Sequence, residues 1–171
     1  MKDSKVVALS AISTAVSLIF IIIGAYFPTF DISCLFMASL MVMLPLAKNS
    51  LKGALLCYGA VFILSFIFTL GHFEICIAFG MFFGLHPIIN YLQLTKFKKV
   101  VLIKVLKTIW FLIVAFILFY LLKMFIVENE IINKYLPLVI LLGGTIFFMF
   151  YDYAMLRFQK TVKIVIEKLK L

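Results

Sequence analysis

The sequence predicts an all-α integral membrane protein, a bundle of six transmembrane helices with a C-terminal amphipathic helix. Of its 171 residues, 66% are hydrophobic and only 13% are charged, whereas a soluble domain is about half apolar and about a quarter charged. The mean hydropathy is +1.25. The charged residues are grouped between long uncharged runs. This pattern argues against a soluble enzyme, a disordered chain and a secreted disulfide-rich domain.

Six uncharged or nearly uncharged runs are close to the roughly 20 apolar residues that one crossing needs. Within one transmembrane domain covering residues 1–171, we expect spans at 6–27, 33–47, 53–70, 75–94, 108–127 and 135–156. The first run is long enough to span and has no small-residue cleavage site before Pro28, so we expect a mature helix rather than a signal peptide. The second run is short, but such a helix can cross where the bilayer thins locally.

Three prolines fall within these spans. Pro45 should end or kink the second span, and Pro87 should kink the fourth near its cytoplasmic third. Pro137 lies near the first turn of the sixth span, where proline is tolerated.

The basic residues predict the orientation. With six spans, all but Lys123 and Lys134 of the 16 Lys and Arg residues fall on one side, together with both termini. Cytoplasmic loops of membrane proteins are enriched in Lys and Arg. We therefore expect a multi-pass plasma-membrane protein with both termini in the cytoplasm, and we attribute the formal net charge of +9 to this bias rather than to nucleic-acid binding.

The tail, residues 157–171, has the pattern of a basic amphipathic helix. Its apolar residues recur at spacings of three and four, and lysines occupy most of the other positions; the apolar set is Phe158, Val162, Val165 and Leu169. Such a helix is expected to lie on an anionic inner leaflet or against a partner protein.

Small residues recur at a spacing of four in two spans. Ala11 and Ala15 form an AxxxA motif in the first span, and Gly80 and Gly84 form a GxxxG motif in the fourth. This spacing places small side chains on one helix face and lets two helices approach closely. Packing within the chain and docking onto another membrane subunit both remain open.

Two polar residues lie inside apolar runs, where an unpaired polar group is costly. His86 could bind a ligand, relay a proton or bond a backbone carbonyl, such as that of Phe83, which Pro87 leaves without its usual donor. Asp152 could pair with Arg157 at an imperfect helical spacing, or with a lysine from another loop. We expect that hydrogen bonds within the chain satisfy the His86 side chain, and that Asp152 has an anchoring role. The Phe82–Pro87 segment has no assigned role.

No motif of an enzyme, a nucleotide site or a metal centre is found in the sequence, so we expect a non-enzyme without cofactor. His72, Glu74 and Cys76 alternate, but helical side chains would diverge, and a metal site is not expected. Cys34, Cys57 and Cys76 all lie in apolar runs, which favours packing over disulfides. On the outer side, Lys123 lies within an apolar run, where it could bind an anion or snorkel to the surface.

The chain resembles a substrate-binding S component of an energy-coupling factor (ECF) transporter. The resemblance covers nearly the whole chain and consists of small size, six spans, cytoplasmic termini and the AxxxA motif Ala11-Ile12-Ser13-Thr14-Ala15 in the first span. It implies that Ala11 and Ala15 dock onto a transmembrane coupling subunit driven by two cytoplasmic ATPases.

The resemblance also implies uptake of a vitamin or similar small molecule, bound toward the outer side. The expected binding residues are Tyr26, Phe27, Glu74, Tyr120 and Lys123, with aromatic rings against a flat ligand. Polar residues are sparse in the outer halves of the spans. The alternative is therefore a non-transporting scaffold or regulatory partner embedded in the membrane, which would use the small-residue faces and the basic inner surface.

Overall fold

The computed structural model describes residues 2–96, 100–120 and 130–168. Within these residues the chain is helical, without strands, and six helices are long and apolar enough to cross a membrane: Ser4–Tyr26, Pro28–Ala47, Leu51–Phe68, Phe73–Thr95, Val100–Tyr120 and Tyr135–Ile166. This confirms the expected fold class and makes the chain a multi-pass membrane protein.

The elements in chain order are α1 (Lys2–Tyr26), the 3₁₀ turn η1 (Pro28–Phe30), α2 (Asp31–Ala47), α3 (Leu51–Phe68), α4 (Phe73–Ala78), the π-helical turn η2 (Phe79–Phe83), α5 (His86–Thr95), α6 (Val100–Tyr120) and α7 (Glu130–Lys168). The helix of the fifth span begins at Val100, eight residues before the expected boundary at 108. Lys104 and Lys107 are therefore helical, and only Lys107 is buried.

Short-range hydrogen bonds define the end of α2 and the start of α3. Pro45 lies in the last turn of α2, which ends at Ala47, in agreement with the expected end of the span, and its carbonyl accepts from the backbone N–H of Lys48 and of Ser50, both at 3.1 Å. Asn49 turns the chain with a φ of 57°, a conformation that asparagine tolerates. The Ser50 side chain then caps α3 by accepting from the Gly53 N–H at 3.1 Å.

The fourth span changes helix type before Pro87. The Gly84 N–H donates to the Phe79 carbonyl at 2.8 Å, five residues back, and regular α-helix resumes at His86. A π turn inside an α-helix bends it and is frequent at functional sites. The interruption expected at Pro87 is therefore displaced to Phe79–Leu85, and Pro87 occupies the first turn of α5.

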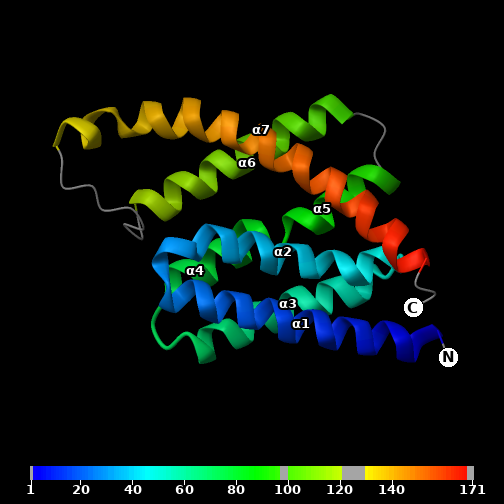
Figure 1. The fold of residues 1–171 in the computed structure, drawn as a ribbon. Helices are drawn as coiled ribbons and strands as arrows, with labels where there is room; N and C mark the ends of the chain where they lie inside the picture. The colour runs from blue at the N-terminus through cyan, green and yellow to red at the C-terminus, as the bar shows by residue number, and fades with distance from the viewer. Residues whose placement is uncertain (1, 97–99, 121–129, 169–171) are drawn as a thin grey trace.

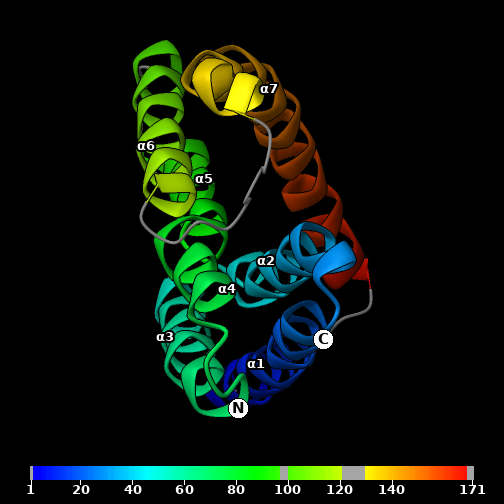
Figure 2. The same cartoon turned by 90° about the vertical axis from the view of Figure 1, so that its left-hand side faces the viewer.

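The helices form three layers, which are not equally tightly packed against one another. Figure 1 shows α6 and α7 on one side, α2 with α4 and α5 in the middle, and α1 with α3 on the other side; the end-on view in Figure 2 agrees. Both termini lie at one end of the bundle (Figure 1), as an even number of crossings requires. Only Lys107 and Val114 are buried along α6, so this helix is the least enclosed of the spans within the described residues.

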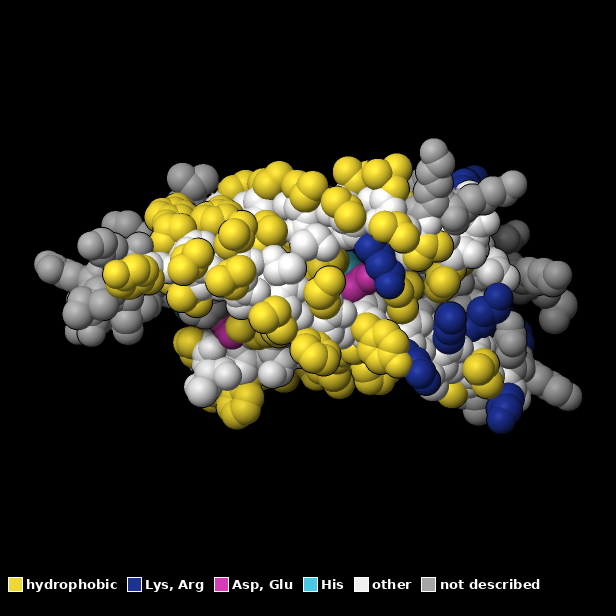
Figure 3. Space-filling model, turned by 90° about the horizontal axis from the view of Figure 1, so that it is seen from above, with side chains coloured by type: hydrophobic (Ala, Val, Ile, Leu, Met, Phe, Trp, Pro, Cys, Tyr) yellow, Lys and Arg dark blue, Asp and Glu magenta, His cyan; other side chains and the backbone are white. Residues whose placement is uncertain are grey.

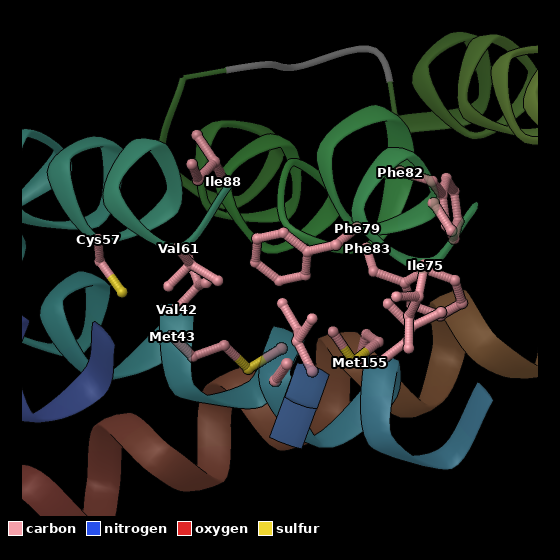
Figure 4. Packing of buried hydrophobic residues seen from close by; sticks show 14 of the residues in the cluster. Val42, Met43, Cys57, Val61, Ile75, Phe79, Phe82, Phe83, Ile88 and Met155 are labelled. Carbon is pink, nitrogen blue, oxygen red and sulfur yellow. The ribbon is translucent and has the colours of Figure 1, made fainter. Parts of the chain in front are cut away.

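The core lies on both sides of the middle layer and includes residues of α1 and α3 on one side and of α6 and α7 on the other. Figure 4 shows Phe79 between Val61 of α3 and Met43 of α2. The GxxxG motif packs inside the chain: a Cβ on Gly80 would lie 2.2 Å from the Phe62 ring, and one on Gly84 would lie 2.6 Å from the Tyr58 ring. The Tyr58 hydroxyl donates to the Gly80 carbonyl at 2.9 Å.

Two further expectations can be compared with the structure. The three cysteines, Cys34, Cys57 and Cys76, are buried and free, as their apolar surroundings indicated.

The C-terminal helix is present and continuous with the sixth span. Its buried positions among the described residues are Gln159 and Ile166, whereas Phe158 and Val165 are 44% and 46% exposed, and Leu169 lies outside the described residues. The tail thus packs on α2 and α5 through a partly polar face.

Figure 3 shows the distribution of charge on the face formed by α6 and α7. The Lys and Arg side chains gather toward the end that carries both termini, and hydrophobic side chains cover most of the remainder of this face. A basic end next to an apolar surface suits a protein that lies in a bilayer with its basic end against an anionic membrane surface.

Candidate functional site

Four polar side chains from three helices meet inside the bundle. His86 and Asn90 come from α5, Lys107 from α6 and Asp152 from α7, and each is at most 4% exposed. His86 Nε2 lies 3.1 Å from Asp152 Oδ1, and Lys107 Nζ donates to Asn90 Oδ1 at 2.8 Å. Lys107 Nζ also donates to Asp152 Oδ1. Asn90 Nδ2 lies 3.4 Å from His86 Nδ1 and closes the ring.

The four residues, called here the buried polar cluster, combine one carboxylate with one ammonium. Burying either charge alone would be very costly, and the cost is offset only when the partner is present and further hydrogen bonds satisfy both groups. Asn90 and His86 supply those hydrogen bonds. The cluster therefore ties α5, α6 and α7 together at a level inside the membrane-spanning region.

The partners differ from some that the sequence suggested. Asp152 pairs with Lys107, a lysine assigned to the inner loop by its position between two spans, and not with Arg157. Arg157 is exposed; its Nε donates to the Tyr153 hydroxyl at 3.0 Å, and its Cζ lies 5.4 Å from the centre of the same ring. His86 is satisfied by Asp152 and Asn90 rather than by the Phe83 carbonyl.

Aromatic rings close the cluster on the side facing away from the termini. The Phe82 ring lies 5.3 Å from His86 and 5.0 Å from Phe111, between ring centres. The Tyr151 ring lies 4.8 Å from that of His86. These contacts give the Phe82–Pro87 segment a role. The π turn places the Phe82 ring against the buried polar cluster, and His86, at the start of α5, belongs to the cluster.

Beyond Phe82 lies an apolar cavity of about 240 Å³. Its walls come from α2, α4, η2, α6 and α7, and among the described residues no lining side chain is polar; the described lining is Ile32, Leu35, Ala78, Phe82, Phe83, Phe111, Val114, Ala115, Leu118, Phe119, Ile140 and Phe147. We call this the apolar cavity. A neighbouring cavity of about 420 Å³ shares Ile32, Phe83 and Phe147 with it. An aliphatic or aromatic group is the chemistry that such walls accept.

The structure brings together some of the residues expected to bind a ligand. Tyr26 makes an edge contact with His72, with ring centres 5.4 Å apart, and His72 Nδ1 lies 3.3 Å from Glu74 Oε1. Phe27 is 58% exposed. Tyr120 stacks on Phe116 with ring centres 5.9 Å apart.

The four expected residues that the structure describes lie outside the apolar cavity. Neither Tyr26, Phe27, Glu74 nor Tyr120 lines it, and Lys123 lies outside the described residues. The lining was missed because its side chains have the same composition as the core, so nothing in the sequence separates wall residues from packed ones.

The two small-residue motifs have different surroundings. Ala11 and Ala15 are exposed, whereas the opposite face of α1 is buried, with the Ser17 hydroxyl donating to the Ala38 carbonyl at 3.0 Å. The AxxxA motif therefore lies on an exposed face of α1 in the described part of the bundle. The GxxxG motif, by contrast, is covered by Tyr58 and Phe62 of α3.

No group of three or more His, Cys, Asp or Glu side chains among the described residues could hold a metal ion. Comparisons of the chain with protein families, with curated proteins and with solved structures give no match.

Proposed function

We propose that this chain is the membrane-embedded binding subunit of an ECF-type uptake transporter, which takes up a vitamin or similar small molecule. The observation that carries the proposal is the apolar cavity, which lies between the α6–α7 pair and the rest of the bundle, at the end away from the termini. A lining without polar groups suits a ligand that inserts an apolar ring or chain and leaves its polar part at the mouth.

The volume limits the ligand. At about 240 Å³ the cavity is slightly smaller than the roughly 300–1,000 Å³ typical of drug-sized ligand sites, so it would hold one ring system or a short chain. The cluster of Tyr26, His72 and Glu74 lies at the same end as the start of α2 and supplies polar groups for the exposed part of the ligand.

The exposed Ala11–Ala15 face is the proposed docking surface for a transmembrane coupling subunit that cytoplasmic ATPases drive. Small side chains allow a second helix to approach closely, and Ala11 and Ala15 are both exposed in the described bundle. We place both termini in the cytoplasm and the chain in the plasma membrane, because the basic residues gather at the terminal end.

The exposed α1 face also fits the alternative, a membrane scaffold or regulatory partner without transport. The two functions differ in what accompanies the protein. A binding subunit retains a small molecule, and it purifies with a coupling subunit and ATPases. A scaffold needs no ligand.

The test is purification from native membranes, followed by mass spectrometry of small molecules and proteins. Ala115→Trp fills the apolar cavity and is expected to abolish retention of the small molecule, while Ile109→Trp, on the lipid-exposed side of the same helix at 49% exposure, retains it. Equal retention by both variants, or no small molecule with the wild type, would contradict the proposal and favour the scaffold.

The docking surface is tested in the same preparation. Ala11→Leu with Ala15→Leu is expected to remove the coupling subunit and the ATPases while leaving the ligand bound, because two bulky side chains prevent close approach. The matched control is Gly59→Leu with Gly143→Leu, since a Cβ added at either glycine would meet no other part of the chain within 4 Å. Retention of all partners by the alanine variant would rule out this face.

A further inference from the structure

A second kind of cavity lies at the terminal end, between α2, α5 and α7. Its volume is about 230 Å³, and its walls combine apolar with polar and basic side chains: Leu46, Ala47, Asn49, Tyr91, Leu94, Thr95, Gln159, Lys160 and Lys163. We call it the basal cavity. It shares no residue with the apolar cavity or the buried polar cluster, and the proposed function does not use it.

Gln159 marks a specific polar requirement in this cavity. Its side chain is 7% exposed, and its Nε2 donates to the Pro87 carbonyl at 3.3 Å. Its Oε1 is buried and has no hydrogen-bond partner. The Pro87 carbonyl can only accept, so the amide cannot reverse without losing that bond. A buried carbonyl without a donor is unfavourable, and a ligand hydroxyl would satisfy it once the Gln159 side chain, which is buried in the cavity wall, turns toward the cavity.

Charge indicates the second requirement. Lys160 and Lys163 line the cavity one turn apart on α7, and its described lining includes no Asp or Glu. Two adjacent ammonium groups favour a phosphate or another compact anion. The ligand therefore combines an anion with at least one hydroxyl group.

The position of the basal cavity indicates the source of the ligand. The spans on either side of it end at Ala47 and Thr95, and Leu46 and Leu94 provide an apolar wall beside the polar groups. This boundary between apolar and basic surface is the level at which lipid headgroups lie. A soluble phosphate would gain nothing from Leu46 and Leu94.

We infer that the basal cavity binds the headgroup of an anionic phospholipid whose phosphodiester carries a free hydroxyl, as phosphatidylglycerol does. Lys160 and Lys163 hold the phosphate, Gln159 Oε1 accepts from the headgroup hydroxyl, and Leu94, which is 47% exposed beside the buried Leu46, contacts the glycerol backbone. The bound lipid fastens the end of α7 to α2 and α5. This inference is independent of the proposed function.

Native mass spectrometry of the purified full chain, titrated with defined lipids, tests the inference. Phosphatidylglycerol is expected to bind about threefold or more tightly than phosphatidylmethanol, which has the same charge but no hydroxyl, and both should bind more tightly than phosphatidylcholine. Lys160→Gln with Lys163→Gln is expected to weaken phosphatidylglycerol binding about tenfold or more. Arg157→Gln with Lys168→Gln removes the same charge from α7 outside the cavity and is expected to leave the affinity unchanged.

Gln159→Leu separates the hydroxyl site from the phosphate site. It is expected to equalise the affinities for phosphatidylglycerol and phosphatidylmethanol while leaving the latter unchanged, and thermal unfolding of each variant confirms that it is folded. Equal weakening by the two charge-removing variants would overturn the inference in favour of a general basic surface. Equal binding of the two anionic lipids to the wild type would overturn the hydroxyl contact, and equally tight binding of free glycerol 3-phosphate would overturn the lipid as the source.

Discussion

Lys107→Met is expected to lower the free energy of unfolding by about 3–5 kcal/mol, the usual cost of removing one partner from a buried ion pair. The exchange keeps an unbranched side chain, one atom shorter, but leaves the Asp152 carboxylate inside the bundle with His86 as its remaining hydrogen-bond partner among the described residues. Asn90 Oδ1 also loses its donor. Unfolding of the purified protein in detergent, by heat or denaturant, measures the loss.

A second exchange distinguishes the ion pair from simple packing. Lys107→Met with Asp152→Asn removes both charges and is expected to recover about half of the lost stability, because no uncompensated charge stays buried. Lys104→Met, at an exposed position on the same helix, is expected to change stability by less than about 0.5 kcal/mol. If the double variant were less stable than Lys107→Met, the buried polar cluster would not be an electrostatic unit.

Gly80→Ala is expected to destabilise the protein by about 1–3 kcal/mol, the typical cost of adding a methyl group to a filled core. The added Cβ would lie 2.2 Å from Phe62 Cε2 and 2.5 Å from Cδ2, so the ring must move, and the hydrogen bond from Tyr58 to the Gly80 carbonyl would be disturbed. The same unfolding experiment measures this effect.

Gly59→Ala provides the matched control on α3. Nothing lies within 4 Å of the added Cβ, and alanine is favoured over glycine inside a helix by about 0.5–1 kcal/mol. The two alanine variants are therefore expected to change stability in opposite directions. A Gly80→Ala protein as stable as the wild type would mean that α3 and the π turn are not in the close contact described here.

The membrane spans could be predicted from the sequence because their signal is collective. Long uncharged runs, and charges confined to a few intervals, identified six helices without reference to any single side chain. The start of the fifth span could not be predicted, because a buried charge lies near it. Lys107 has the charge of a loop residue, but Asp152 neutralises it inside the bundle. In the structure α6 therefore includes Lys107 and begins at Val100.

The functional features needed the structure because they depend on which helices are neighbours. The sequence singled out His86 and Asp152 as costly residues in apolar runs, but it could not show that they meet, since 66 positions separate them. The apolar cavity left no sequence signal, because Phe, Leu, Ile, Val and Ala line both cavities and cores. The AxxxA and GxxxG motifs looked alike, and only the packing of α3 showed that one is covered and the other exposed.

The proposed function depends most on six crossings with both termini on the cytoplasmic side. The direct measurement is labelling of single cysteines in intact cells with a membrane-impermeant maleimide. Thr29→Cys, in the exposed turn between α1 and α2, is expected to label from outside, and Lys96→Cys, after α5, only after permeabilisation. The wild type provides the background, since Cys34, Cys57 and Cys76 are buried. External labelling of Lys96→Cys with protection of Thr29→Cys would contradict the orientation, and external labelling at both positions would contradict the six-span layout.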